Sequence, residues 1–374
     1  MSTAGQAQKA RAAVVRKAGG PFLIEDIEVG SPRDDEVLVR MVGTGVCHTD
    51  IVFRDGAFPM PMPVVLGHEG AGIVESVGAK VKRVKPGDHV VLSFNSCHTC
   101  PNCIKSEPAY CFNFYPYNVA GSRAADGSSA LSKGQEMLHG EFFGQSSFAT
   151  YAMAHEANAV PIPHDLPLEI MGPLGCGVQT GAGATINSLK MKPGDSLAVF
   201  GGGGVGLSAM LGALAVGAGP VIVVEPNRAR GVLALELGAA HVVNPTDTPD
   251  VLAKIKELSG GGVNYAVDTT GIPAVIGVAV ETLLHNGMLG LLGVPPPDAT
   301  LPANLLSMLM RGVGVKYIVE GDSDPQEFIP RLAALFKAGK FPFDRLIKKF
   351  PFEKINEAAR ASETGEVIKP VLIF

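Results

Sequence analysis

The sequence lacks any excess of basic charge and has few charged residues of either sign. Charged residues make up 18% of the 374 positions, the formal net charge is -5, and 46% of the residues are apolar. This composition is typical of a folded globular protein and argues against a disordered chain or a surface that binds nucleic acid. The sequence also lacks internal repeats and low-complexity segments.

An export signal is absent as well. Residues 1–11 are polar and rich in small side chains, without the apolar core and cleavage pattern of a secretory signal. The chain has six cysteines, and disulfides are not the default for a chain of this size without such a signal. We therefore expect a cytoplasmic protein that does not act at a membrane, in which cysteine spacing is the informative feature.

One apolar stretch is long enough to be mistaken for a transmembrane helix. Residues 196–224 contain no charged side chain, and about 20 apolar residues can span a bilayer. The stretch includes four consecutive glycines and Pro220. A strand, a turn, a helix and a second strand in an α/β core therefore explain it better.

The pattern of the chain indicates two domains of different architecture. Residues from about 36 to 95 form short β-branched runs broken by glycine and proline, which is typical of an antiparallel β domain. From Asp195 onward, strand-like and helical runs alternate, which predicts a parallel sheet with helices on both faces. We predict an α/β protein in which residues 1–177 form a β-rich domain and residues 178–320 a doubly wound Rossmann domain. Residues 321–374 form a return segment, and its completion of the first domain rests partly on the resemblance given below.

A dinucleotide fingerprint, Gly201-x-Gly203-x-x-Gly206, follows an apolar strand and opens a helix. Its glycines let the chain turn tightly and approach a pyrophosphate, which then lies at the helix N-terminus. Glu225 ends the next strand, where a carboxylate accepts hydrogen bonds from ribose hydroxyls and repels a 2′-phosphate. NAD is therefore favoured over NADP, although Arg228 lies close enough in sequence to meet a phosphate. A glycine-rich turn without a nucleotide is the alternative.

Four cysteines gather in one loop-rich segment: Cys97, Cys100, Cys103 and Cys111. Four thiolates suit a closed tetrahedral zinc site that holds a loop together. A redox site needs only one cysteine pair on a thioredoxin-like scaffold and fits this spacing poorly. An iron–sulfur cluster also uses four cysteines and stays open as an alternative.

The two remaining cysteines, Cys47 and Cys176, predict a second metal site with His68 as a third ligand. Two thiolates, one imidazole and a free fourth position are typical of the catalytic zinc of alcohol dehydrogenases. Taken singly, Cys176 could be a small buried hydrophobe and His68 a satisfied core histidine. No cysteine is left over once both sites are assigned, which favours two metal sites.

At this point the sequence resembles the zinc-containing medium-chain alcohol dehydrogenases, over nearly the whole chain. The segment from Gly67-His68-Glu69 to Val81 matches that family's zinc signature. Three further segments, residues 45–50, 143–148 and 172–177, together with the ending at residues 368–371, resemble the aryl-alcohol (benzyl alcohol) dehydrogenases and the related geraniol dehydrogenases.

The resemblance implies a GroES-like catalytic domain, a homodimer or homotetramer, and two zinc ions per subunit. The implied reaction is the reversible, NAD-linked oxidation of a primary aromatic or allylic alcohol to the aldehyde by hydride transfer. The catalytic zinc would be held by Cys47, His68 and Cys176, and the structural zinc by the four-cysteine cluster. The implied cofactor contacts are Gly201, Gly203, Gly204, Val205, Gly206, Glu225, Arg228, His48, Thr180, Val294 and Lys369, the last as a phosphate contact.

Roles around the catalytic zinc follow from the same resemblance. Asp50 would orient His68, Glu69 would assist ligand exchange, and the Thr49 hydroxyl would take the substrate proton. Many relatives continue the proton relay through a histidine three residues after the threonine, but this chain has Val52 there.

The end of the relay is therefore open. His48 is a candidate because a neutral imidazole can carry a proton, and contact with the pyrophosphate alone is an equally good interpretation.

For the substrate, Phe94 and Phe142 match family positions that line the alcohol pocket, with Val294 near the nicotinamide. Aromatic walls suit a flat or unsaturated apolar alcohol, although either ring could be ordinary core. The alternatives are a dehydrogenase for another alcohol class, such as an aliphatic alcohol, a polyol or a glutathione adduct, and a non-catalytic NAD-binding protein or thiol redox sensor.

Overall fold

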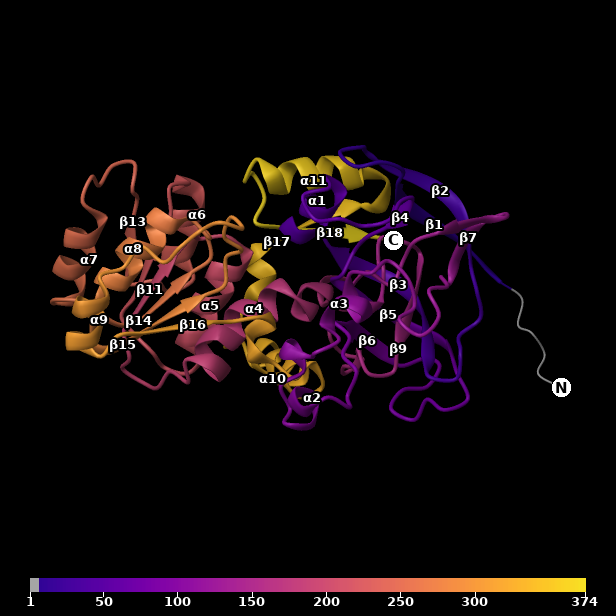
Figure 1. The fold of residues 1–374 in the computed structure, drawn as a ribbon, viewed down its shortest axis with the longest axis horizontal. Coiled ribbons are helices and arrows are strands. Elements are labelled where there is room, and N and C mark those ends of the chain that lie inside the picture. Colours follow the sequence, from indigo (N-terminus) through magenta and orange to yellow (C-terminus); the bar gives the residue numbers. More distant parts are fainter. Residues whose placement is uncertain (1–6) are drawn as a thin grey trace. The chain divides into compact units, whose positions relative to one another are not determined.

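The computed structural model describes residues 7–374, which form two compact units (Figure 1). Unit 1 comprises the described residues up to Cys176, Asp324–Lys337 and Asp344–Phe374, and unit 2 comprises Gly177–Ser323 and Ala338–Phe343. The boundaries after residues 177 and 320 stay a prediction; within the predicted return segment, Ala338–Phe343 groups with unit 2. This short piece carries two fully buried rings, Phe341 and Phe343.

Unit 1 is built on two sheets. The first has the strand order β4-β1-β2-β7-β8, and all its pairings are antiparallel. Its strands are β1 (Gln8–Val15), β2 (Phe22–Val29), β4 (Val64–Val65), β7 (Leu131–Lys133) and β8 (Glu136–Leu138). The apolar side chains of β1 are fully buried from Ala12 to Val15, which anchors this sheet in the larger core of the unit.

The second sheet of unit 1 has the order β10-β6-β5-β3-β18-β17, with β9 also paired to β3. Its strands are β3 (Glu36–Gly45), β5 (Gly70–Val77), β6 (His89–Leu92), β9 (Tyr151–His155), β10 (Ala159–Pro161), β17 (Ile347–Pro351) and β18 (Lys369–Ile373). The C-terminal strand β18 pairs antiparallel with β3. The last residues of the chain are thereby brought beside the loop that follows β3, where Cys47 lies.

Short helices connect these strands. They are α1 (His48–Arg54), α2 (Pro101–Ile104), α3 (Phe114–Asn118), α10 (Pro325–Lys337) and α11 (Ile355–Glu363). Helix α11 places Ile355, Ala358 and Ala359 at 0% exposure in the same core as β1. Its sequence spacing of apolar residues is that of an amphipathic helix with one buried face.

Unit 2, magenta to orange in Figure 1, is a six-stranded parallel sheet of order β13-β12-β11-β14-β15-β16. Its strands are β11 (Leu197–Phe200), β12 (Val221–Val224), β13 (His241–Val243), β14 (Val263–Asp268), β15 (Leu283–Leu291) and β16 (Gly314–Tyr317). Its helices are α4 (Gly177–Gly183), a π-helical turn (Ala184–Ser188), α5 (Gly204–Ala215), α6 (Arg228–Glu236), α7 (Val251–Ser259), α8 (Pro273–Glu281) and α9 (Leu305–Arg311). The predicted α/β class with a Rossmann-type sheet is confirmed.

The charge-free stretch at residues 196–224 becomes β11, α5 and β12, as predicted. Both strands are buried along their whole length, since helices cover the two faces of a parallel sheet. Across residues 7–374, none of the helices has the length and apolar character needed to cross a membrane.

Candidate metal centres and cofactor site

The first candidate centre gathers Cys47, His68, Glu69 and Cys176, whose ligand atoms all lie within 4.8 Å of one another. The four residues come from three separate segments of unit 1. Cys47 precedes α1, His68 and Glu69 precede β5, and Cys176 follows a 3-10 turn at Gly172–Gly175. The fold of unit 1, rather than local spacing, therefore brings these side chains together.

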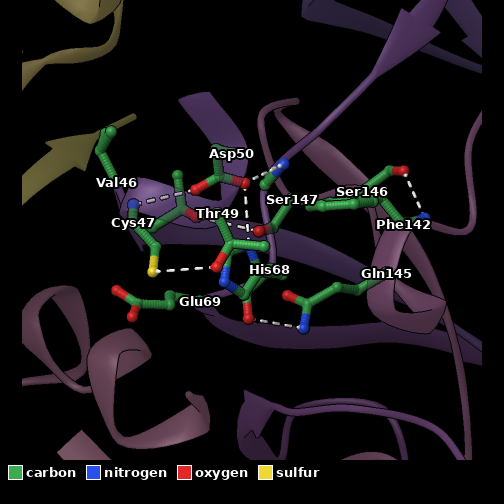
Figure 2. A network of polar contacts seen from close by, with 12 residues as sticks. Val46, Cys47, Thr49, Asp50, His68, Glu69, Phe142, Gln145, Ser146 and Ser147 are labelled. Carbon is green, nitrogen blue, oxygen red and sulfur yellow. Dashed lines mark hydrogen bonds and ion pairs between the residues drawn. The ribbon is translucent and has the colours of Figure 1, made fainter. Parts of the chain in front are cut away.

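Asp50 organises this centre (Figure 2). Its carboxylate is fully buried and accepts hydrogen bonds from the backbone N–H groups of Cys47, at 2.9 Å, and Gly67, at 3.1 Å. It also lies 2.8 Å from Nδ1 of His68. A carboxylate can only accept, so Nδ1 carries the proton and Nε2 is left with its lone pair. The predicted orienting contact of Asp50 is present.

His68 Nε2 is buried and has no hydrogen-bond partner in the described chain. A buried imidazole nitrogen without a partner carries a desolvation cost unless something fills its lone pair. Two sulfur atoms lie beside it, and hydrogen bonding with Cys176, together with the charge of Lys369, holds the pKa of Cys47 well below its usual value. One imidazole and two thiolates fit zinc, and the unpartnered nitrogen supports that fit.

Lys369 has a partner that the sequence did not indicate. Its ammonium donates to both carboxylate oxygens of Glu69, at 2.8 Å each, and both side chains are buried. Burial alone would lower the pKa of Lys369, but the charges of Glu69 and Cys47 outweigh it and raise that pKa. The expected contact of Lys369 with a phosphate stays a prediction, whereas its ion pair within the metal centre is a feature of the fold.

Aromatic rings cover one side of His68. The Phe143 ring stacks on the imidazole at 4.6 Å between centroids, and the Phe142 ring meets it edge-on at 5.4 Å. Phe142 is fully buried and also packs against Phe53 at 5.0 Å. The sequence analysis singled out Phe142 and missed Phe143.

Of the other two residues expected to line a substrate pocket, one belongs to each unit. Phe94 is buried in unit 1, where its ring lies 6.1 Å from that of Phe114. Val294 belongs to unit 2, follows β15 and is 77% exposed. Their contact with a substrate stays a prediction.

Two side chains of helix α1 complete the predicted catalytic set. The Thr49 hydroxyl oxygen lies 3.8 Å from Cys47 Sγ, at the edge of the metal centre. His48 is exposed at the first position of the helix, and Val52 lies one turn further on. Thr49 therefore has access to the centre, while no described hydrogen bond links it to His48.

The second candidate centre contains Cys97, Cys100, Cys103 and Cys111, with all sulfur atoms within 4.8 Å of one another. The Cys100–Cys103 and Cys97–Cys103 sulfur distances are 3.5 and 3.9 Å, too long for a disulfide of about 2.05 Å. Tetrahedral zinc with bonds of about 2.3 Å separates its sulfurs by about 3.8 Å. An iron–sulfur cluster would hold its cysteines farther apart because they bind different irons.

Backbone amides also support this four-cysteine centre. The N–H groups of Cys97 and Asn113 donate to Cys111 Sγ at 3.3 and 3.4 Å, and that of Cys100 donates to Cys97 Sγ at 3.4 Å. Such donors stabilise thiolate over thiol, which is the form a metal requires. The arrangement favours a single ion that closes the loop.

The glycine fingerprint of unit 2 has the geometry of a phosphate cradle. Gly201 has φ +99°, a conformation that L side chains rarely adopt, and a Cβ on Gly206 would lie 1.8 Å from the Gly201 carbonyl oxygen. Gly203, the N-cap of α5, instead faces open space. Gly201 therefore serves the turn, Gly206 allows the helix to pack closely against it, and Gly203 leaves room for a ligand at the helix start, where Gly204 and Val205 follow.

Glu225 lies beside this cradle. It is 4% exposed, and its carboxylate accepts hydrogen bonds from the Gly202 N–H at 2.6 Å and the Asn227 N–H at 2.8 Å. Arg228 is exposed and pairs with Asp247 at 3.0 Å. The negative charge at the cradle is thus fixed, whereas the arginine is engaged elsewhere.

Thr180 is held within unit 2 by a neighbouring acid. Its hydroxyl donates to Oε2 of Glu320 at 3.3 Å, and Glu320 is buried with a left-handed backbone at φ 49°. Whether Thr180 also touches the cofactor stays a prediction.

Comparison with known proteins identifies relatives along most of the chain. Residues 33–164 match the alcohol dehydrogenase GroES-like domain family, and residues 204–337 match the zinc-binding dehydrogenase family. A geraniol dehydrogenase of Castellaniella defragrans is 56% identical over 365 residues, which cover 98% of each chain.

Two solved structures are also closely similar. A benzyl alcohol dehydrogenase from Acinetobacter calcoaceticus is 43% identical, with a TM-score of 0.95 over 98% of this chain and 99% of that one. An alcohol dehydrogenase zinc-binding domain protein from Burkholderia ambifaria is 49% identical, with a TM-score of 0.97 over 99% of this chain and 100% of that one.

Proposed function

The chain belongs to the zinc-dependent alcohol dehydrogenases, and we propose that it oxidises a primary aromatic or allylic alcohol, of the benzyl alcohol or geraniol kind, to the aldehyde with NAD as hydride acceptor. The observation that carries this proposal is the unpartnered Nε2 of His68 beside the Cys47 and Cys176 sulfurs. We assign these three residues as ligands of the catalytic zinc and the four-cysteine cluster as ligands of the structural zinc.

Zinc bound at the first centre supplies a Lewis acid that lowers the pKa of an alcohol hydroxyl toward neutrality. The chain's own residues do the rest. Asp50 fixes the ring of His68, and the two phenylalanine rings on His68 exclude water from that side. Glu69, neutralised by Lys369, lies close enough to take part in ligand exchange without adding net charge to the centre.

Thr49 is the group we propose to accept the substrate proton. Its hydroxyl adjoins Cys47 Sγ and can pass a proton onward toward solvent. Because Val52 cannot carry a proton, we propose exposed His48 as the next acceptor. Replacing His48 with Arg should slow turnover a few-fold at low pH and less at high pH, with little change in the KM for NAD; equal slowing at every pH would remove His48 from the relay.

NAD rather than NADP is supported by Glu225. A 2′-phosphate would have to approach a buried carboxylate that two backbone N–H groups hold in place. The aromatic residues around His68 and the names of the two similar dehydrogenases support a flat or unsaturated substrate.

A homodimer is the proposed assembly. Strand β16 pairs only with β15 among the described strands, so it is an edge strand of the sheet. Helix α9, close in sequence, exposes four large apolar side chains, Leu305, Leu306, Leu309 and Met310. An edge strand and an exposed apolar helix surface suit isologous pairing with a second copy.

Sedimentation of the wild type and of a Leu309→Asp variant tests the dimer, and a monomeric wild type would refute it. A cytoplasmic location stays a prediction.

The activity is tested by following NAD reduction with benzyl alcohol, geraniol, ethanol and a polyol, before and after chelation, with zinc counted per chain. Activity on the first two alcohols that is lost with the metal, and about two zinc ions per chain, are expected. Faster turnover of ethanol or the polyol would refute the substrate class, and no turnover of any alcohol by the zinc-loaded protein would refute the activity.

A further inference from the structure

Unit 1 contains a polar cavity that none of the proposed catalytic or zinc-binding roles explains. Its volume is about 280 Å³, and it lies beside the four-cysteine loop, with Cys97 and Tyr117 in its wall. Four acidic side chains and two arginines line it: Asp35, Glu36, Glu141, Glu156, Arg33 and Arg123. Acidic groups thus outnumber guanidinium groups around a partly open space large enough for a small molecule.

The two arginines already have carboxylate partners. Arg123 binds both oxygens of Glu36, at 2.5 and 2.7 Å, and this pair is buried. Arg33 binds Asp126 at 2.8 Å. Burial lowers the pKa of His155, which also lines the cavity, so this histidine adds no cation near neutral pH.

Glu141 is the one acid of this wall that is buried without a partner. Its side chain is 7% exposed, and its carboxyl makes no hydrogen bond or ion pair with any residue of the described chain. Burial and the charge of Glu36 raise the pKa of Glu141 to about 7. Its carboxyl oxygens are not among the fully buried polar atoms that lack a partner, so a molecule in the cavity can reach them.

The backbone at Glu141 is also unusual. Glu141 and Phe143 have left-handed φ values of 58° and 51°, as does Ser146 at 52°. Non-glycine residues in this region cost about 1 kcal/mol or more each and persist where the surroundings impose them, often at ligand sites. The same short segment carries Phe142 and Phe143 to His68, so it links the cavity wall to the catalytic centre.

We propose that this cavity is a binding site for a small organic cation with a guanidinium or primary ammonium group, and that Glu141 is its counter-ion. The Arg123 guanidinium donates to both oxygens of the Glu36 carboxylate. A bound guanidinium would pair with the Glu141 carboxylate in the same way, because its planar group presents two N–H groups to one carboxylate. Tyr117 also lines the cavity and supplies an aromatic group to its wall.

The test uses two probes of nearly equal shape, methylguanidinium and uncharged N-methylurea, titrated calorimetrically into the zinc-loaded full chain. Methylguanidinium should bind at millimolar concentration and at least about tenfold more tightly than methylurea, because only the cation can neutralise Glu141. Equal affinities, or no binding of either probe, would overturn the proposal and leave a cavity that holds water only.

Two variants make the assignment specific to Glu141. Glu141→Gln keeps the shape but removes the charge and should weaken methylguanidinium binding about tenfold without changing methylurea binding. Glu75→Gln makes the same charge change on an exposed part of β5 and should leave both affinities within about twofold. Unchanged binding to the Glu141 variant would also overturn the proposal, and thermal melts with zinc counts establish that each variant is folded.

Discussion

The two metal centres of unit 1 are equally compact but are assembled in opposite ways. The four-cysteine centre takes all its ligands from one short segment and is supported by nearby backbone N–H groups. The other draws on three distant segments and needs Asp50 and the Glu69–Lys369 pair to hold it. The negative charge of four thiolates exceeds the positive charge of a divalent ion. Two thiolates and a neutral imidazole only balance that charge, and the open fourth position lets the ion act as a Lewis acid. The first arrangement stabilises a loop, and the second can act on a substrate.

The largest effect should come from removing a ligand of the centre formed by Cys47, His68 and Cys176. We call it the distributed centre, because its ligands come from distant segments, and the four-cysteine centre the local centre. His68→Ala should lower kcat by at least about 10³-fold, because a Lewis acid contributes several kcal/mol to the transition state. Metal analysis should find one zinc ion fewer per chain, and the melting temperature should change little. His285→Ala, on an exposed part of unit 2, is the control. Substantial activity in the His68 variant would remove the contrast between the centres.

Cys103→Ser should act on stability instead. Loss of the zinc ion of the four-cysteine centre should lower the free energy of unfolding by about 3 kcal/mol, and the melting temperature by roughly 10 °C. The kcat of the protein that remains folded should stay within about threefold of wild type. Calorimetry and activity at low temperature measure the two quantities, and a fall in kcat without a fall in melting temperature would contradict a purely structural role.

Asp50→Asn tests the support of the distributed centre. One amide oxygen cannot accept the three contacts that the carboxylate makes, so the His68 ring should lose its fixed orientation. We expect kcat/KM or zinc affinity to fall by about 10–100-fold. Chelator competition measures the zinc affinity, and exposed Asp26→Asn is the matched control. Wild-type values for the Asp50 variant would show that zinc alone orients the imidazole.

The smallest effect concerns Glu141, next to the local centre. Its pKa rises from 4.5 to about 7 on folding, so the folded state keeps a proton that the unfolded chain loses as pH rises through this window. Stability therefore falls between about pH 4.5 and pH 7. Glu141→Gln removes this cost and should be more stable than wild type at pH 8, by about 2 kcal/mol, and less so at pH 5. Melting curves at both pH values measure the difference, and an equal difference at both would exclude Glu141 as its source.

The contrast between the centres also explains what could be predicted from the sequence. Cysteine spacing and the glycine fingerprint are local patterns, so the four-cysteine loop and the turn before α5 were predictable from residue order. The zinc signature indicated His68 through the resemblance to a family. The Lys369–Glu69 pair joins residues 300 positions apart, and it depends on the register of β18. Stacking of Phe143 on His68 and the burial of Glu141 likewise depend on tertiary packing, which no local pattern encodes.

The position of β18 in the sequence determines when, during translation, the catalytic centre can be completed. All four cysteines of the local centre have been translated before Cys176, whereas Lys369 lies in the last strand of the chain. Until the ribosome releases that strand, β3 lacks one neighbour and Glu69 lacks its cation. A nascent chain can therefore close its structural loop early, but it completes the centre that acts on alcohol only after the strand that carries Lys369 has been made.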